Sequence, residues 1–133
     1  MNFIVDSCVF ISFYDSSDSN HEKAINDLEK ISSNNDSIWV TEHILDEILN
    51  IFLRRNYKKQ ISSFIDLIKK NNIRIVFPKN QASSLELASR TMEAVLKQKR
   101  KKASYTDLYS LEITMSQPEN TFEVISYDHP LKY

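Results

Sequence analysis

Short apolar runs alternate with longer amphipathic segments along the chain, and this alternation constrains the fold more than any other feature. The runs of strand length cover residues 2–5, 38–40, 73–77 and 124–127. The segments between them repeat apolar residues at helical intervals. Because parallel strands are buried on both faces and need helical crossovers, the pattern predicts an α/β fold, a three-layer α/β/α sandwich with a central parallel sheet of about four strands. At 133 residues the chain is most simply one domain, residues 1–133.

Cap-like residues mark where several of the expected helices begin. Ser19 and Glu22 have the spacing of a capping box, and Ser83 and Glu86 repeat it. Thr41 follows a strand-length run and is suited to cap the helix after it. The expected helices cover residues 8–14, 19–31, 42–56, 58–70, 83 to the 97–102 region, and 104–115.

Composition excludes several classes of protein. The chain has no glycine, whereas the P-loop and the dinucleotide-binding fingerprint both need glycine where the backbone approaches phosphate. Its one cysteine cannot form an internal disulfide, which suits a reducing compartment. No apolar stretch approaches the roughly 18 residues of a membrane helix, so we expect a cytoplasmic protein with no membrane partner. The net charge of −1 means that any nucleic-acid surface must be a local patch.

Four acidic residues occupy positions where functional carboxylates are expected. Asp6 ends the first apolar run and Asp128 ends the last, and the carboxyl ends of parallel strands lie beside the crevice that binds ligands in open α/β sheets. Glu47 and Asp107 fall on expected helices. Carboxylates gathered at one place repel one another unless they share a hard cation, and Mg²⁺ or Mn²⁺ with oxygen ligands fits that need. The pattern therefore indicates a metal-dependent phosphodiester enzyme.

Each of these acids also has a purely structural explanation. The two strand-end aspartates suit turns, in which the side chain bonds to its own backbone. Asp107 has a capping-box-like spacing with Ser104, and a carboxylate in a first helical turn is favoured by the helix dipole. Asp46 and Glu47 flank the apolar face of their helix on opposite edges, so periodicity does not choose between them. The ordered set of four carries more information than any single member.

The ordered motifs resemble the PIN domain, and in particular the VapC-type toxins of prokaryotic toxin–antitoxin pairs. The similar segments are FIVDSCVFI at residues 3–11, His21 with Ala24, ILDEIL at 44–49, SYTD at 104–107 and ISYD at 125–128. The resemblance extends from residue 2 to residue 131. Only five residues follow Asp128, so we expect the family's fifth strand to be missing or very short.

The resemblance implies an endoribonuclease that cleaves single-stranded RNA with one or two Mg²⁺ or Mn²⁺ ions. It implies that Asp6, Glu47, Asp107 and Asp128 bind the metal and are catalytic, and it favours Glu47 over its acidic neighbour on the helix. Ser7 matches a hydroxyl position that supports such a site. An antitoxin protein is the partner implied by the toxin group, and a homodimer is a further expectation.

Two basic runs adjoin the acidic positions. Arg54 and Arg55, with Lys58 and Lys59, follow Glu47. The second run precedes Asp107 and consists of Lys97, Lys99, Arg100, Lys101 and Lys102. Cations at helix ends are commonly solvated and suit the helix dipole, but RNA also needs cations that hold its phosphates beside a negative site. We predict RNA contacts from Arg54, Arg55, Lys99, Arg100, Lys101 and Lys102.

Other functions fit parts of the sequence. A catalytically silent PIN-fold module that binds RNA or protein is the main alternative. A phosphoacceptor domain would need a lysine near the last strand of the acidic site, and Lys132 lies too late in the chain. His43 and Glu47 have the i, i+4 spacing of a zinc pair, without a cysteine or second histidine to complete it. The aromatic side chains of Phe10, Phe13 and Tyr14 fit either the core or a surface that binds a partner helix.

Overall fold

The structure is a computed structural model that describes residues 1–98, 103–116 and 122–127. Its strands form one parallel sheet in the order β3-β2-β1-β4. The strands are β1 (Asn2–Val5), β2 (Ser37–Thr41), β3 (Ile73–Val76) and β4 (Phe122–Ile125). The four predicted strands are confirmed, and β4 both begins and ends two residues earlier than the sequence suggested, because Val5 pairs with Ile125 where β1 ends.

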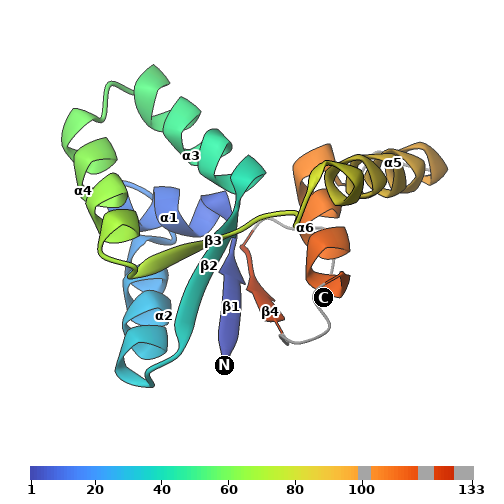
Figure 1. Ribbon diagram of the computed structural model, residues 1–133. Coiled ribbons are helices and arrows are strands. Elements are labelled where there is room, and N and C mark those ends of the chain that lie inside the picture. Colours follow the sequence, from blue (N-terminus) through green and yellow to red (C-terminus); the bar gives the residue numbers. More distant parts are fainter. Residues whose placement is uncertain (99–102, 117–121, 128–133) are drawn as a thin grey trace.

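Helices cover both faces of this sheet. They are α1 (Ser7–Tyr14), α2 (His21–Ser33), α3 (Glu42–Arg54), α4 (Lys58–Lys69), α5 (Gln81–Lys97) and α6 (Tyr105–Met115). Figure 1 shows α1 to α4 on one side of the sheet and α5 and α6 on the other. Because parallel crossovers are right-handed, the helices change side where the chain reverses its direction across the sheet. The predicted three-layer α/β/α sandwich is thereby confirmed.

Two predicted caps are present. The Thr41 side chain accepts a hydrogen bond from the Ile44 N–H at 3.1 Å and begins α3 directly at the end of β2. Ser104 and Asp107 form a full capping box at the start of α6, with bonds of 3.0 and 3.2 Å. Both helices therefore start at positions that are fixed by side chains as well as by packing.

Two other predicted caps are wrong. Helix α5 begins at Gln81 and is capped by Asn80, whose side chain accepts from the Ser83 N–H at 2.9 Å, so the helix starts before the predicted Ser83 cap. Helix α2 follows Asn20 and has no side-chain cap in place of the predicted Ser19. Here Asp18 accepts the Asn20 N–H at 2.8 Å and holds the preceding turn instead. Asparagine and aspartate compete with serine for these short-range bonds, which sequence spacing alone does not resolve.

Asparagine takes the place of glycine at three helix ends. Asn35, Asn56 and Asn71 follow α2, α3 and α4 with φ angles of 58°, 58° and 59°. In each case the next residue donates its N–H to a carbonyl five residues back, as in the bond from Tyr57 to Phe52 at 2.9 Å. Asparagine tolerates the left-handed conformation better than other non-glycine residues. This explains how a chain without glycine ends its helices, and why α3 stops before the predicted residue 56.

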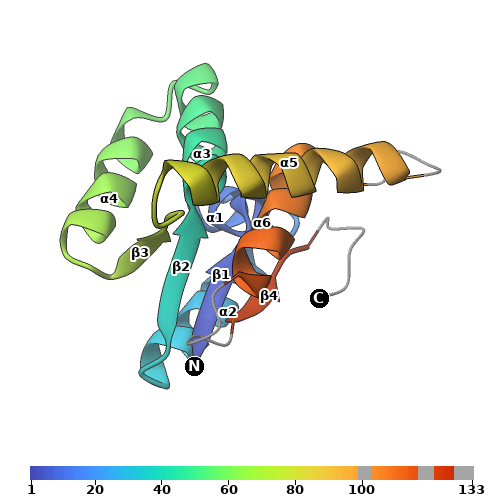
Figure 2. The same cartoon turned by 45° about the vertical axis from the view of Figure 1, so that its right-hand side comes forward.

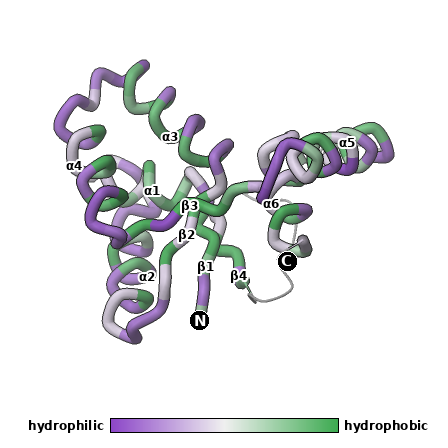
Figure 3. Tube along the Cα trace, viewed as in Figure 1, coloured by the Kyte–Doolittle hydropathy of each residue, from purple (hydrophilic) through white to green (hydrophobic). Residues whose placement is uncertain are grey.

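The core lies between the sheet and the helices, where the strands are mostly hydrophobic and the helices alternate hydrophobic and hydrophilic residues (Figure 3). Phe10 of α1, Phe52 of α3 and Phe64 of α4 are almost completely buried. Phe64 packs edge-to-face against Phe10 at 5.2 Å and against Phe52 at 6.5 Å between ring centroids. This aromatic cluster joins three helices on one face of the sheet. No helix within the described ranges is long and apolar enough to cross a membrane.

Candidate active site

Asp6 lies at the carboxyl end of β1, beside the end of β4. Its backbone N–H donates to the Ile125 carbonyl at 2.9 Å. Its Oδ1 accepts from the Ser7 N–H and its Oδ2 from the Ser126 hydroxyl, both at 2.8 Å. The chain leaves β1 toward β2, whereas β4 lies on the other side, so this is the point at which strand order reverses. Open α/β sheets bind ligands at such switch points.

Ser7 connects Asp6 to Glu47. Ser7 is buried, its backbone N–H bonds to Asp6, and its hydroxyl donates to Glu47 Oε1 in a short hydrogen bond. Glu47 is half-buried, whereas Asp46 beside it is exposed. The helix periodicity left these two acids undecided, and the hydrogen bond from α1 directs Glu47 toward Asp6. A buried residue that donates to two acidic side chains, to one through its N–H and to the other through its hydroxyl, fixes the geometry of both.

Asp107 is the third residue of α6, and its carboxylate accepts from the Ser104 N–H in the capping box. The next residue back, Thr106, lines the same surface hollow as Glu47. The first turn of α6 therefore lies next to the acidic face of α3. Asp107 serves as a cap, and a carboxylate retains further acceptor positions beyond the one that this bond uses.

Aromatic and acidic side chains hold the start of α6 against the start of α3. The Tyr109 hydroxyl donates to Glu42, and the His43 ring packs edge-to-face on Tyr109 at 4.2 Å and on Tyr105 at 5.5 Å. Burial, together with the Glu42 carboxylate, raises the pKa of Tyr109, so its hydroxyl stays protonated and continues to donate. Local sequence patterns do not predict this contact, because Tyr109 and Glu42 are 67 positions apart in the chain.

Arg54 and Arg55 point to different parts of the surface. Arg54 lines the hollow that also contains Glu47, His43 and Thr106. Arg55 forms a salt bridge with Asp15 at 3.3 Å, at the loop after α1. Of these two neighbouring arginines, only Arg54 thus lies beside the acidic residues. The predicted contacts at Lys99, Arg100, Lys101 and Lys102 lie outside the described residues.

The described side chains at this edge fit a hard cation in chemistry but do not by themselves form a complete set of ligands. Carboxylate and hydroxyl oxygens are the ligands that Mg²⁺ and Mn²⁺ prefer. Within residues 1–98, 103–116 and 122–127, no three His, Cys, Asp or Glu side chains gather in a group able to hold a metal ion. Asp128, the fourth predicted ligand, lies outside the described residues. The assignment of Asp6, Glu47, Asp107 and Asp128 as ligands therefore stays a prediction.

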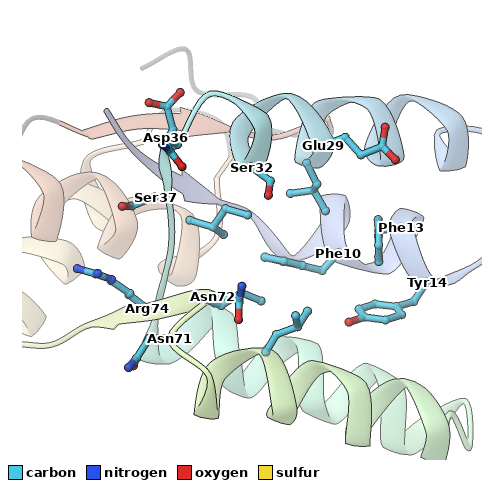
Figure 4. Close-up of a pocket in the computed structure, with 15 residues that line it drawn as sticks. Phe10, Phe13, Tyr14, Glu29, Ser32, Asp36, Ser37, Asn71, Asn72 and Arg74 are labelled. Carbon is cyan, nitrogen blue, oxygen red and sulfur yellow. The ribbon is translucent and has the colours of Figure 1, made fainter.

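A second cavity, of about 420 Å³, lies at the opposite end of the strands. It opens between α2 and α4, near the first residues of β2 and β3 (Figure 4). Phe10, Phe13 and Tyr14 form part of its wall, and only Phe10 among them is fully buried. This cavity is separate from the acidic edge, because its strand residues belong to the amino ends of the sheet.

Comparison with known proteins identifies the family. The sequence matches the PIN domain model over residues 3–111, which is most of the chain. This chain belongs to the PIN domain family. A similar fold occurs in the crystal structure of VapC20 from Mycobacterium tuberculosis, described as a toxin that cleaves the sarcin–ricin loop. The TM-score is 0.69 at 12% identity, over 93% of this chain and 89% of that one. The sequence has no match among curated proteins.

The family match ends at residue 111 and so includes the segments that carry Asp6, Glu47 and Asp107. Two neighbours of the site were not predicted from the sequence, Ser126 and Glu42. Ser126 follows β4 and bonds to Asp6, and its place in the motif before Asp128 was the signal that could have identified it.

Proposed function

We propose that this PIN-domain protein is a Mg²⁺- or Mn²⁺-dependent endoribonuclease that cleaves single-stranded RNA and acts as the toxin of a type II toxin–antitoxin pair. The observation that carries the proposal is the chain of contacts from Ser126 to Asp6 and through Ser7 to Glu47, at the switch point of the sheet. A hydrolase needs such fixed, charged oxygens where substrate enters. The partners proposed are RNA, a cognate antitoxin and a second copy of the chain, in the cytoplasm.

The proposal assigns a separate role to each residue of the candidate site. Asp6 and Asp107 hold the principal ion, and Glu47 and Asp128 complete its shell or orient water. Ser7 positions two of the carboxylates and is a positioning residue. When bound, a divalent ion supplies Lewis-acid chemistry, which makes water more acidic and offsets charge on the reacting phosphodiester. No side chain acts as a covalent nucleophile.

Cleavage of a labelled single-stranded RNA by the purified protein tests this function. We expect cleavage with Mg²⁺ or Mn²⁺, complete loss with EDTA, and recovery when excess metal is added back. A catalytically silent RNA-binding module would retain RNA binding and cleave nothing under any of these conditions. That result would contradict the proposed ribonuclease function and favour an RNA-binding module.

Arg54 and Arg55 offer a matched pair of variants for RNA binding. Arg54→Ala removes a cation from the hollow that contains Glu47, whereas Arg55→Ala removes one that is paired with Asp15. We expect Arg54→Ala to weaken RNA binding and to flatten the log–log salt dependence by ~0.7, the value for one lost phosphate contact on a single strand. Arg55→Ala is expected to leave the slope unchanged, so the RNA contact that the sequence predicts for Arg55 is not part of this proposal. Equal slopes for both variants would show that Arg54 does not contact an RNA phosphate.

The second basic run is expected to affect substrate binding and not metal binding. Neutralising Lys99, Arg100, Lys101 and Lys102 together removes charge but no proposed ligand. RNA binding should become weaker and less salt-dependent, by ~0.7 in slope per lost contact, while Mn²⁺ affinity stays at the wild-type value. Filter binding across a salt series measures the slope. An unchanged slope would identify this run as a solvated helix end.

A further inference from the structure

The two residues that follow β4 lie outside the sheet and contact other elements. Strand β4 ends at Ile125, so Ser126 and Tyr127 are not part of its hydrogen-bond ladder with β1. The Ser126 hydroxyl donates to Asp6 Oδ2 at 2.8 Å. The Tyr127 N–H donates to Cys8 Sγ at 3.3 Å, and the same sulfur lies 3.5 Å from Ser126 Oγ. Because sulfur is a weak acceptor, the contact with Cys8 alone holds this segment only weakly.

The Tyr127 side chain packs on helix α2. Its hydroxyl donates to Asp27 Oδ2 at 2.6 Å, and the Lys23 ammonium lies 4.7 Å from the centre of its ring. Lys23 and Asp27 are separated by about one turn of α2, and Asp27 is half-buried. A hydroxyl bonded to a carboxylate at this distance forms one of the stronger hydrogen bonds in proteins, and a cation over an aromatic ring adds to it. Figure 2 shows α2 on the side of the sheet opposite α6, so Tyr127 connects the end of β4 to that side.

We propose that Tyr127 is a positioning residue of the acidic edge, which holds Ser126 against Asp6 by its contacts with α2. Asp6 accepts from Ser7 through one carboxylate oxygen and from Ser126 through the other, so both donors are needed to fix the carboxylate plane. The described contacts of Tyr127 reach Cys8 and α2, so Tyr127 acts on Asp6 through Ser126. This role rests on the proposed function and extends it to helix α2.

The reactivity of the Cys8 thiol reports whether Tyr127 holds this segment, without metal or RNA. Cys8 is the single cysteine of the chain, and it is half-buried where the Tyr127 N–H bonds to it. Tyr127→Phe removes the bond to Asp27 and retains the ring. The segment should then open more often, and the rate at which an aromatic disulfide reagent labels Cys8 should rise about tenfold.

The matched control for this variant is Tyr14→Phe. It removes another tyrosine hydroxyl, which bonds to Ser63 at 3.3 Å, at the end of α1 farther from Cys8. Its labelling rate should match that of the wild type, and circular dichroism should show that both variants are folded. Equal labelling rates in the wild type, Tyr127→Phe and Tyr14→Phe would overturn the proposal.

Mn²⁺ binding, measured by electron paramagnetic resonance, tests whether Tyr127 acts through Ser126. Partners that orient a metal-binding side chain change the metal affinity by about 10–100-fold. We expect Tyr127→Phe to bind Mn²⁺ about tenfold more weakly than the wild type and Ser126→Ala to bind it at least as weakly, whereas Tyr14→Phe should be unchanged. The double variant of Tyr127 and Ser126 should bind no more weakly than Ser126→Ala alone, because residues in one network are not additive. Additive effects would overturn the proposal.

RNA cleavage at increasing Mn²⁺ distinguishes a failure of this role from a failure of the proposed function. Excess Mn²⁺ should restore cleavage by Tyr127→Phe but not by Asp6→Asn, since Tyr127→Phe retains every proposed ligand. A wild type that binds Mn²⁺ and cleaves RNA, with Tyr127→Phe equal to it at every Mn²⁺ concentration, would overturn the role of Tyr127 alone. A wild type that neither binds Mn²⁺ nor cleaves RNA would contradict the proposed function, and the role of Tyr127 with it.

Discussion

Asp6→Asn is expected to abolish RNA cleavage while leaving the protein folded. Asn retains an acceptor for the Ser7 N–H, and the Ser126 hydroxyl is able to accept from the new amide. Asn also caps a helix as well as Asp, so the free energy of unfolding should change by less than about 0.5 kcal/mol, or rise slightly as repulsion between carboxylates is relieved. The initial cleavage rate should fall by more than the roughly 10–100-fold that loss of an outer-shell partner costs.

The control for this variant is Asp46→Asn. Asp46 is exposed on α3 directly before Glu47, so its substitution removes the same charge from nearly the same place. We expect its cleavage rate and metal requirement to match those of the wild type. If Asp6→Asn retained full activity, or if Asp46→Asn lost as much, the proposed site would be misassigned.

Phe64→Ala is expected to give a large loss of stability. Phe64 is completely buried and contacts both Phe10 and Phe52, so its removal leaves a cavity where α1, α3 and α4 meet. Substitutions of this kind cost about 3–5 kcal/mol. Urea denaturation should show this as a lower transition midpoint. Phe77→Ala serves as the control, because Phe77 is 58% exposed and its loss should change stability by about 0.5 kcal/mol or less. Equal losses would contradict the described core.

The strands and several helix starts could be predicted from the sequence, because the patterns that specify them extend over only a few residues. The apolar runs became the four strands, and the Ser104 cap was read from a spacing of three residues. The start of α5 was not predicted correctly, because Asn80 and Ser83 are both residues that commonly cap helices. In the structure Asn80 has the extended backbone of an N-cap and accepts the Ser83 N–H. The helix ends were also hard to predict, because the chain has no glycine and asparagines such as Asn56 end the helices in the left-handed conformation.

Only part of the candidate site could be predicted from the sequence. The position of Asp6 after a strand was evident, because a strand end is a local feature. The choice of Glu47 over Asp46 rests on the family resemblance, because periodicity does not separate the two acids. The hydrogen bond from Ser7 to Glu47 joins residues 40 positions apart, so local patterns do not predict it. The contact between Tyr109 and Glu42 depends on how α6 packs on α3. Contacts of this range depend on tertiary structure, which periodicity does not describe.

Mn²⁺ binding by the purified protein tests the central claim most directly. The electron paramagnetic resonance signal of free Mn²⁺ reports how much metal the protein removes from solution, whether or not it cleaves RNA. We expect binding by the wild type, at least about tenfold weaker binding by Asp6→Asn and by Asp107→Asn, and unchanged binding by Asp46→Asn. Equal Mn²⁺ affinity in all four proteins would contradict a metal site at this edge of the sheet.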